Sequence, residues 1–158
     1  MSNTQSMCTS FLGQLMTGTH NFGSAPIRAA STADTFKAAL YLTSGSIDAS
    51  TTAYTATGEV TGTNYTAGGV TVTNATAPTS TNSSSTAGVG YWTPSASIVY
   101  STVTLSTAFN AMLMYNSTQS NAAVAVFTFG SQTITAGNFT LTMPSNTTTT
   151  ALLRISTT

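Results

Sequence analysis

Charged residues are nearly absent from this chain. Its 158 residues include 3 Lys+Arg, 3 Asp+Glu and 1 His, so 4% are charged and the formal net charge is zero. Soluble domains average about 25% charged residues. Solubility must therefore depend on hydroxyl and amide side chains. A neutral chain has no long-range attraction for nucleic acid or for an anionic membrane surface, so neither partner is expected.

Cysteine and long apolar runs are also scarce. Cys8 is the single cysteine, which excludes an intramolecular disulfide and a zinc cluster built on several thiolates. No apolar stretch approaches the roughly 18–20 residues that a membrane-spanning helix requires. The first nine residues lack a basic region followed by an apolar core, so the sequence predicts no signal peptide.

The titratable side chains are few and scattered. Asp34, Asp48, Glu59 and His20 occur with no paired spacing such as E-x-x-H or D-x-D. General acid–base catalysis usually needs two positioned titratable groups, and metal ions need clustered ligands. We therefore expect no catalytic residue, no metal site and no cofactor, and a protein that is not an enzyme. His20 is expected to be a capping or surface residue at the end of the predicted helix, where a cation is favoured.

Apolar residues near the N-terminus recur at helical spacing. They predict a short helix that ends near Gly18, and a division into a helical arm (residues 1–23) and a β domain (residues 24–158). The helix is interpreted either as a docking or subunit-swapping arm or as a lid over one open face of the β domain. The apolar positions are Met7, Phe11, Leu12, Leu15 and Met16.

From about residue 24 onward the sequence is typical of β-structure. Thr, Val, Ile, Tyr and Phe dominate, and turn residues recur every eight to fifteen positions. These features predict an all-β fold, either an antiparallel β-sandwich, jelly-roll-like, or a barrel, with the short N-terminal helix added. The expected strands cover residues 35–43, 70–73, 98–105, 109–115, 122–129, 138–143 and 151–155.

Three details of these strands are predicted locally. The apolar phase changes around Ser101 and Thr102, which indicates a bulge. Residues 109–115 and 122–129 are apolar on both faces, so they are expected to be central and covered on both sides. Gly68 and Gly69 are typical of a tight turn before the strand that begins at residue 70.

Tyr91 and Trp92 form the most distinctive aromatic pair. An exposed pair could stack on a sugar or anchor an interface, because Tyr and Trp are enriched at interfaces. A core position for Trp92, the single tryptophan, is the favoured interpretation because tryptophan is highly buried on average. Cys8 is expected to be a small hydrophobe beside the helix.

Residues 58–72 read G-E-V-T-G-T-N-Y-T-A-G-G-V-T-V. This pattern, E-V-x-G-x-x-Y-x-x-G-G followed by an alternating strand, resembles a group of small structural proteins of tailed bacteriophages. The resemblance extends in order over roughly residues 8 to 156 and implies a β-rich virion component. This chain has Thr and Asn where commoner members of the group have acidic strands and loops.

The resemblance and the composition together predict a capsid decoration or cement protein. Such a protein would be made in the host cytoplasm, would bind the outer surface of the phage head as a homotrimer or homodimer, and would bridge major capsid protein subunits. A neck, collar or tail component is the first alternative, and a carbohydrate-binding module of a fibre or adhesin is the second. The interface candidates are Met7, Phe11, Leu15, Met16, Tyr91 and Trp92.

Overall fold

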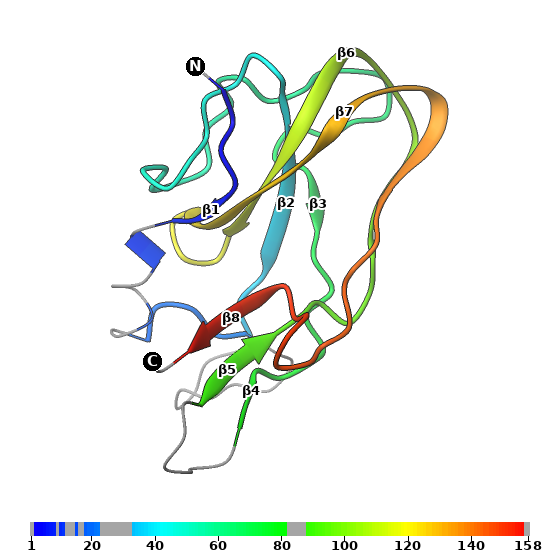
Figure 1. Cartoon of the computed structure of the whole chain (residues 1–158). Helices are drawn as coiled ribbons and strands as arrows, with labels where there is room; N and C mark the ends of the chain where they lie inside the picture. The colour runs from blue at the N-terminus through cyan, green and yellow to red at the C-terminus, as the bar shows by residue number, and fades with distance from the viewer. Residues whose placement is uncertain are drawn as a thin grey trace.

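β-branched and aromatic residues form the strands that dominate the regular structure of this chain. The computed structural model describes residues 2–8, 10–11, 15, 18–22, 33–81 and 88–156. Over these ranges two antiparallel sheets, one of five strands and one of three, pack against each other (Figure 1). Neither sheet closes on itself in the described part of the chain. The structure therefore confirms the all-β sandwich, and the barrel alternative does not hold.

The five-stranded sheet carries the larger part of the core. Its strand order is β1-β7-β6-β2-β3, and every neighbouring pair is antiparallel. Strands β2, β6 and β7 are the long ones, whereas β1 and β3 add two residues each at the edges. The strand bounds are β1 Ser6–Met7, β2 Phe36–Leu42, β3 Val70–Thr71, β6 Ile98–Asn116 and β7 Ala122–Leu141.

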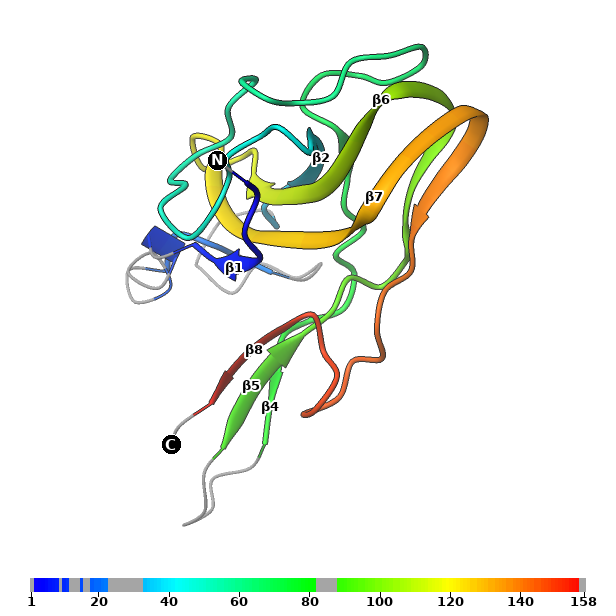
Figure 2. The same ribbon diagram turned by 45° about the horizontal axis from the view of Figure 1, so that its top comes forward.

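The three-stranded sheet contains the aromatic pair of the sequence and the C-terminal strand. Its order is β4-β5-β8, with β4 at Thr79–Ser80, β5 at Val89–Trp92 and β8 at Leu153–Ser156. Figure 2 shows this sheet below the curved β6–β7 pair. Trp92 of β5 lies against Phe36 of β2, with ring centroids 6.3 Å apart, so an aromatic contact joins the two sheets.

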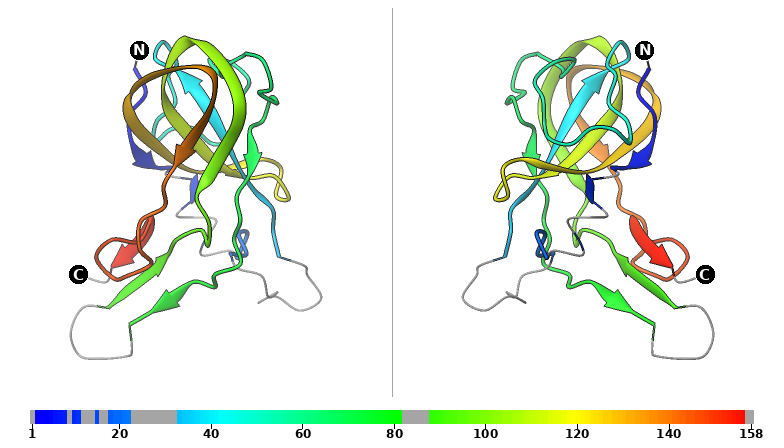
Figure 3. Two further views of the ribbon diagram at one scale, coloured as in Figure 1. Left: turned by 90° about the vertical axis from the view of Figure 1, so that its right-hand side faces the viewer. Right: turned by 90° about the vertical axis from the view of Figure 1, so that its left-hand side faces the viewer.

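Strands β6 and β7 form one long, bent hairpin. The sequence predicted four separate strands here, and the structure joins them into two that pair from Ile98 with Leu141 to Asn116 with Ala122. The predicted bulge is confirmed, because the register shifts between Tyr100 and Val103 and Thr102 has a φ of 51°. Such irregularities bend a strand, and both side views show the ribbon curving strongly (Figure 3).

The turn end of this hairpin lies in the centre of the core. Residues 111–116 of β6 and 122–126 of β7 are all buried, which confirms the prediction for these parts of the two segments, whereas residues 127–129 are half-buried. Strand β2 pairs with β6 over the same region, from Phe36 with Asn116 to Leu42 with Phe109. The predicted central position of these segments therefore follows from their apolar residues on both faces.

The N-terminal segment differs from the predicted helix at its start. Met7 lies in strand β1, whose backbone pairs with Ala125 and Val126 of β7, so the prediction of a helical Met7 is wrong. Ser10, Phe11 and Leu15 are helical. Pairing with a long neighbouring strand outweighs the weak local helix preference, since a helix this short is marginal without tertiary support. Residues 6–7 are therefore part of the five-stranded sheet.

We expect Gly69→Ala to lower the free energy of unfolding by about 2–4 kcal/mol, from backbone strain and overpacking together. Gly69 has a φ of +72°, and a Cβ atom there would lie 1.6 Å from the carbonyl oxygen of Ala38 in β2. Gly90 is the matched control, because its Cβ atom would lie 3.8 Å from the nearest atom, the carbonyl oxygen of Ile155. Urea denaturation of both variants measures the difference, and equal stability would contradict the tight turn.

Candidate functional site

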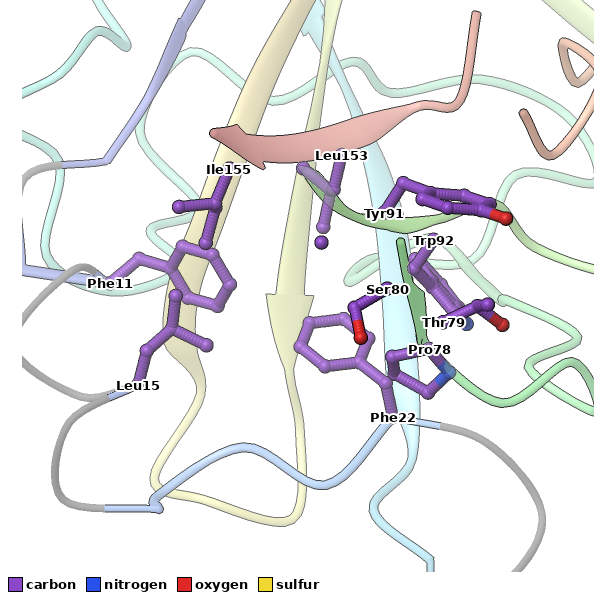
Figure 4. Close-up of a pocket in the computed structure, with 11 residues that line it drawn as sticks. Phe11, Leu15, Phe22, Pro78, Thr79, Ser80, Tyr91, Trp92, Leu153 and Ile155 are labelled. Atoms are coloured by element: carbon purple, nitrogen blue, oxygen red, sulfur yellow. The ribbon is translucent and has the colours of Figure 1, made fainter. Parts of the chain in front are cut away.

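An apolar groove lies between the N-terminal segment and the three-stranded sheet. Its volume is about 350 Å³. Figure 4 shows Phe11, Leu15 and Ile155 on one side of the groove and Tyr91 and Trp92 on the other, with Leu153 of β8 next to Trp92. No charged residue is among its described lining residues, which are Phe11, Leu15, Phe22, Pro78, Thr79, Ser80, Gly90, Tyr91, Trp92, Leu153 and Ile155.

Buried aromatic rings form the floor of this groove. Phe11, Phe22 and Trp92 are 1%, 7% and 2% exposed. The Phe22 ring lies 4.7 Å from the Trp92 ring and is stacked on Phe36 at 4.4 Å. The indole N–H of Trp92 donates to the carbonyl oxygen of Thr76 at 2.7 Å. Trp92 is therefore a core residue, as the sequence favoured, and one ring of a fixed aromatic cluster.

The structure brings together four of the six interface candidates. Phe11 and Leu15 of the N-terminal segment and Tyr91 and Trp92 of β5 all line the groove, although 75 or more residues separate the two pairs in the sequence (91 − 15 = 76). Met7 lies instead beside a second groove of about 470 Å³, which is lined mainly by polar groups and includes Arg154. Met16 lies outside the described residues.

The sequence did not single out seven of the eleven groove residues, among them the large hydrophobic residues Phe22, Leu153 and Ile155. Phe22 follows the predicted helix with no periodic signal, and Leu153 and Ile155 were assigned only to a terminal strand. The alternation of Leu153 and Ile155 in that strand was the available signal, because alternate residues share one face. Ile155 is 47% exposed and Val99 is 40% exposed, and these are the two exposed large hydrophobic residues of the described part of the chain.

The buried carboxylate of Glu59 organises a hydrogen-bond network away from the groove. Glu59 is 7% exposed. Its Oε2 accepts a hydrogen bond from the hydroxyl of Tyr54 at 2.6 Å. Its Oε1 accepts from the hydroxyl of Tyr65 at 2.7 Å and from the backbone N–H of Gly68 at 2.7 Å. Tyr65 in turn accepts from the backbone N–H of Leu40 at 2.9 Å, so the network ties this loop to β2.

The tyrosines around Glu59 resist ionisation. Burial, followed by the hydrogen bond to Glu59, raises the pKa of Tyr54 to about 12. The same two causes raise the pKa of Tyr65 further. Burial first and the charge of Glu59 second raise the pKa of Tyr100 and Tyr115 as well. At neutral pH these hydroxyls are therefore fixed hydrogen-bond donors.

The E-V-x-G-x-x-Y-x-x-G-G motif of residues 59–69 forms this same network. Glu59 bonds Tyr65 and Gly68, and the carbonyl oxygen of Gly68 accepts from the hydroxyl of Tyr115 at 2.8 Å. A Cβ atom at Gly62 would lie 2.1 Å from the carbonyl oxygen of Thr104, so this loop also approaches β6 closely. The motif residues hold a loop against β2 and β6, and this is a structural role.

A second buried polar cluster surrounds Asp34, which is 3% exposed. Its Oδ2 accepts from the backbone N–H of Asn21 and from the Asn116 amide, both at 2.8 Å, and its Oδ1 accepts from the Gln119 amide at 3.1 Å. The Asn116 amide nitrogen also lies 3.1 Å from Nδ1 of His20. The prediction of a surface position for His20 is wrong, because its side chain is 9% exposed and packs on the Phe11 ring, with centroids 4.9 Å apart.

The thiol of Cys8 is shielded from solvent and resists ionisation. Cys8 is fully buried, and burial, with a smaller contribution from Asp48, raises the pKa of its thiol to about 11. Within the described residues, no three His, Cys, Asp or Glu side chains gather closely enough to hold a metal ion. No helix in the same part of the chain is long and apolar enough to cross a membrane.

Comparison with known proteins yields no match. No family model, no curated protein and no solved structure is significantly similar to the chain.

Proposed function

We propose that this protein is a non-enzymatic structural component of a tailed-phage virion. In this role it is a capsid decoration or cement protein that binds the outer surface of the head and stabilises contacts between major capsid subunits. The observation that carries the proposal is the long uncharged part of the chain. No Asp, Glu, Lys, Arg or His occurs between Glu59 and Arg154, a span that contains strands β3 to β7.

Apart from Val99, Gly130 and Ala136, the exposed residues of the β6–β7 hairpin are polar, and none is charged. They provide hydroxyl and amide groups without a charge that would repel a second neutral surface. Such surfaces associate through shape, hydrogen bonds and apolar contacts, and near-zero net charge promotes association. The exposed polar residues are Ser101, Thr102, Ser106, Thr107, Ser131, Gln132, Thr133, Thr135, Asn138 and Thr140.

The use of the acidic groups also supports a structural role. The carboxylates of Glu59 and Asp34 are buried and accept hydrogen bonds from nearby loops and strands. A general acid or base must instead reach a substrate atom within hydrogen-bond distance. Many copies of a rigid neutral protein reinforce a shell through avidity, because each modest contact is multiplied over the lattice. The proposed partners are the major capsid protein and further copies of this chain, as a homotrimer or homodimer.

The proposal is tested by the stoichiometry of this chain in purified virions. Quantitative mass spectrometry against the major capsid protein is expected to give a ratio near one to one or a simple fraction of it. A value of about a dozen copies or fewer per particle would assign the protein to the neck, collar or tail instead. Absence from the particle would overturn the virion role.

A salt series adds an independent test of how the protein attaches. Capsids that lack the protein are mixed with purified protein at increasing sodium chloride concentration, and bound protein is measured after sedimentation. Because uncharged surfaces lack ion pairs that salt can screen, we expect less than about a threefold change in affinity across the series. A steep loss of binding would contradict attachment through the neutral surface.

The carbohydrate-binding alternative is less well supported by the geometry. A sugar stacks on an exposed aromatic face, whereas Trp92 is 2% exposed and packs against Phe22 and Phe36. Its indole N–H already donates to Thr76. Tyr91 is half-buried and would be the single aromatic residue of the pair available to a sugar.

A further inference from the structure

The apolar groove beside Trp92 has the properties of a small-molecule site. Ligand pockets usually enclose about 300–1,000 Å³, are lined by apolar and aromatic side chains, and carry a few polar groups. This groove encloses about 350 Å³. Its aromatic floor is formed by Phe11, Phe22 and Trp92, and the polar groups on its lining are the hydroxyls of Thr79, Ser80 and Tyr91.

We propose that this groove binds a small uncharged aromatic molecule. This inference is independent of the proposed role in the virion. No charged side chain among the described lining residues could pair with an ionised ligand, which would lose its hydration without compensation. The second groove differs in this respect, because it is more polar and includes Arg154.

The dimensions of the groove favour a free small molecule over a protein segment. Water occupies about 30 Å³ per molecule, so the groove has room for roughly ten waters or one fused ring system. Its floor is closed by residues that are at most 8% exposed: Phe11, Phe22, Trp92 and Leu153. Stable protein interfaces are broad, at about 800 Å² per partner, whereas a recess of about 350 Å³ has the size that one small molecule fills.

The aromatic rings of the floor favour a planar ring as the occupant. Aromatic pairs prefer offset-stacked or edge-to-face arrangements, and the floor rings already adopt both. Phe11 and Phe22 meet edge to face, with centroids 6.0 Å apart, and Phe22 and Phe36 are stacked. Leu15 and Ile155 at the opening add aliphatic contacts (Figure 4). A flat apolar ligand could therefore extend the existing cluster toward solvent.

Trp92 makes the inference directly testable, because it is the single tryptophan of the chain. The probe is N-phenyl-1-naphthylamine, an uncharged aromatic compound that fluoresces in apolar surroundings and accepts energy from tryptophan. We expect saturable binding with a Kd on the order of 10–100 μM. Energy transfer from Trp92 shows that the probe is bound to the protein within transfer distance of this residue. A linear, non-saturating signal would overturn the proposal.

Two variants localise the probe. Ile155→Glu introduces a carboxylate at the opening of the groove, and we expect at least a tenfold weaker affinity, because an unpaired charge there opposes apolar binding. Val99→Glu is the matched control, since Val99 has a similar exposure, 40% against 47%, and does not line the groove. Equal affinities of the two variants would contradict binding in the groove. If Ile155→Glu fails to fold, Ile155→Thr replaces it, with an expected loss of about threefold.

Competition defines the ligand class. Uncharged 2-naphthol is expected to displace the probe at about tenfold lower concentration than 2-naphthoate, which is ionised at neutral pH. Displacement by methyl glucoside would assign the groove to sugars and overturn the proposal. Loss of probe binding as the chain self-associates would assign the groove to a second copy and would also overturn it. The virion stoichiometry is unaffected by any of these outcomes, so the two proposals fail separately.

Discussion

Replacing Glu59 with alanine is expected to lower the free energy of unfolding by about 3–5 kcal/mol. The carboxylate accepts three hydrogen bonds, from the hydroxyls of Tyr54 and Tyr65 and from the backbone N–H of Gly68. Removing it leaves these donors without their acceptor in a region where Glu59 itself is 7% exposed. Leaving a buried donor unsatisfied costs more free energy than its hydrogen bond contributed, which makes the effect large.

Glu59→Gln is the control that separates hydrogen bonding from side-chain volume. The amide oxygen can replace Oε1 and still accept from Tyr65 and Gly68. The amide nitrogen can replace Oε2 and donate to the hydroxyl of Tyr54, which can rotate its own proton away. We therefore expect a loss of only about 1 kcal/mol, since three bonds persist without the charge. Urea denaturation followed by circular dichroism measures both variants. A loss as large for Gln as for Ala would contradict this geometry.

The second large expected effect is cooperative unfolding at alkaline pH. Burial is the first cause of a raised pKa for Tyr41, Tyr54, Tyr65, Tyr100 and Tyr115. In the unfolded chain these hydroxyls ionise near pH 10. Between that pH and the folded pKa, which for Tyr54 is about 12, the folded state keeps protons that the unfolded state releases.

The sign of the effect follows from this difference in bound protons. Because the unfolded state binds fewer protons, stability falls as pH rises above about 10, and these tyrosines contribute no pH dependence well below that value. Each fully buried tyrosine, such as Tyr41 or Tyr100, lowers stability by up to about 1.4 kcal/mol per pH unit. Cys8 acts in the same direction from about pH 9, because its folded pKa is about 11.

Tyrosinate absorbance and circular dichroism, recorded together along a pH series, test this expectation. We expect both signals to change in one transition below about pH 12, since ionisation and unfolding are linked. Tyr54→Phe should make stability fall less steeply with pH, because one fewer proton is released on unfolding. Gradual ionisation with an intact β-sheet signal at pH 11 would contradict the burial of these hydroxyls.

The two proposals use different parts of the molecule. The virion role depends on the neutral outer surface of the β6–β7 hairpin and its partners in the particle. The ligand proposal depends on a recess whose floor belongs to the aromatic core. A protein that is abundant in virions and also binds the naphthylamine probe would satisfy both proposals. A positive result in one test has no bearing on the other proposal.

Local sequence patterns predicted the fold class and several of its details. Residues with period-two alternation and β-branched side chains form strands wherever neighbours are available, so the all-β class followed from composition and spacing. The bulge near Thr102 was visible because a phase change of the apolar residues is itself local, and the structure confirms it. Gly68 and Gly69 have φ values of 85° and 72°, which glycine adopts readily, so the turn was also predictable.

The sequence predicted some residues of the candidate site but not that they lie together. The sequence singled out Phe11 and Leu15 in one segment and Tyr91 and Trp92 in another. It contained no indication that they would share a groove. It placed Met7 in the helix, whereas β7 pairs with it as a strand. Local propensity differs by less than about 1 kcal/mol between such states, and pairing with a long strand decides the outcome.

What the sequence by itself determined is therefore the neutral composition, the all-β class, the bulge and the glycine turn, because each depends on residues a few positions apart. Only the tertiary structure decided the hydrogen-bond network of Glu59, the buried position of His20, and the groove in which residues of the N-terminal segment meet Trp92. The hydroxyl of Tyr100 bonds the carbonyl oxygen of Ala38, and that of Tyr115 bonds Gly68, across separations of 62 and 47 residues. Such contacts depend on strand order and register, which are set by the packing of the whole core and not by any single segment.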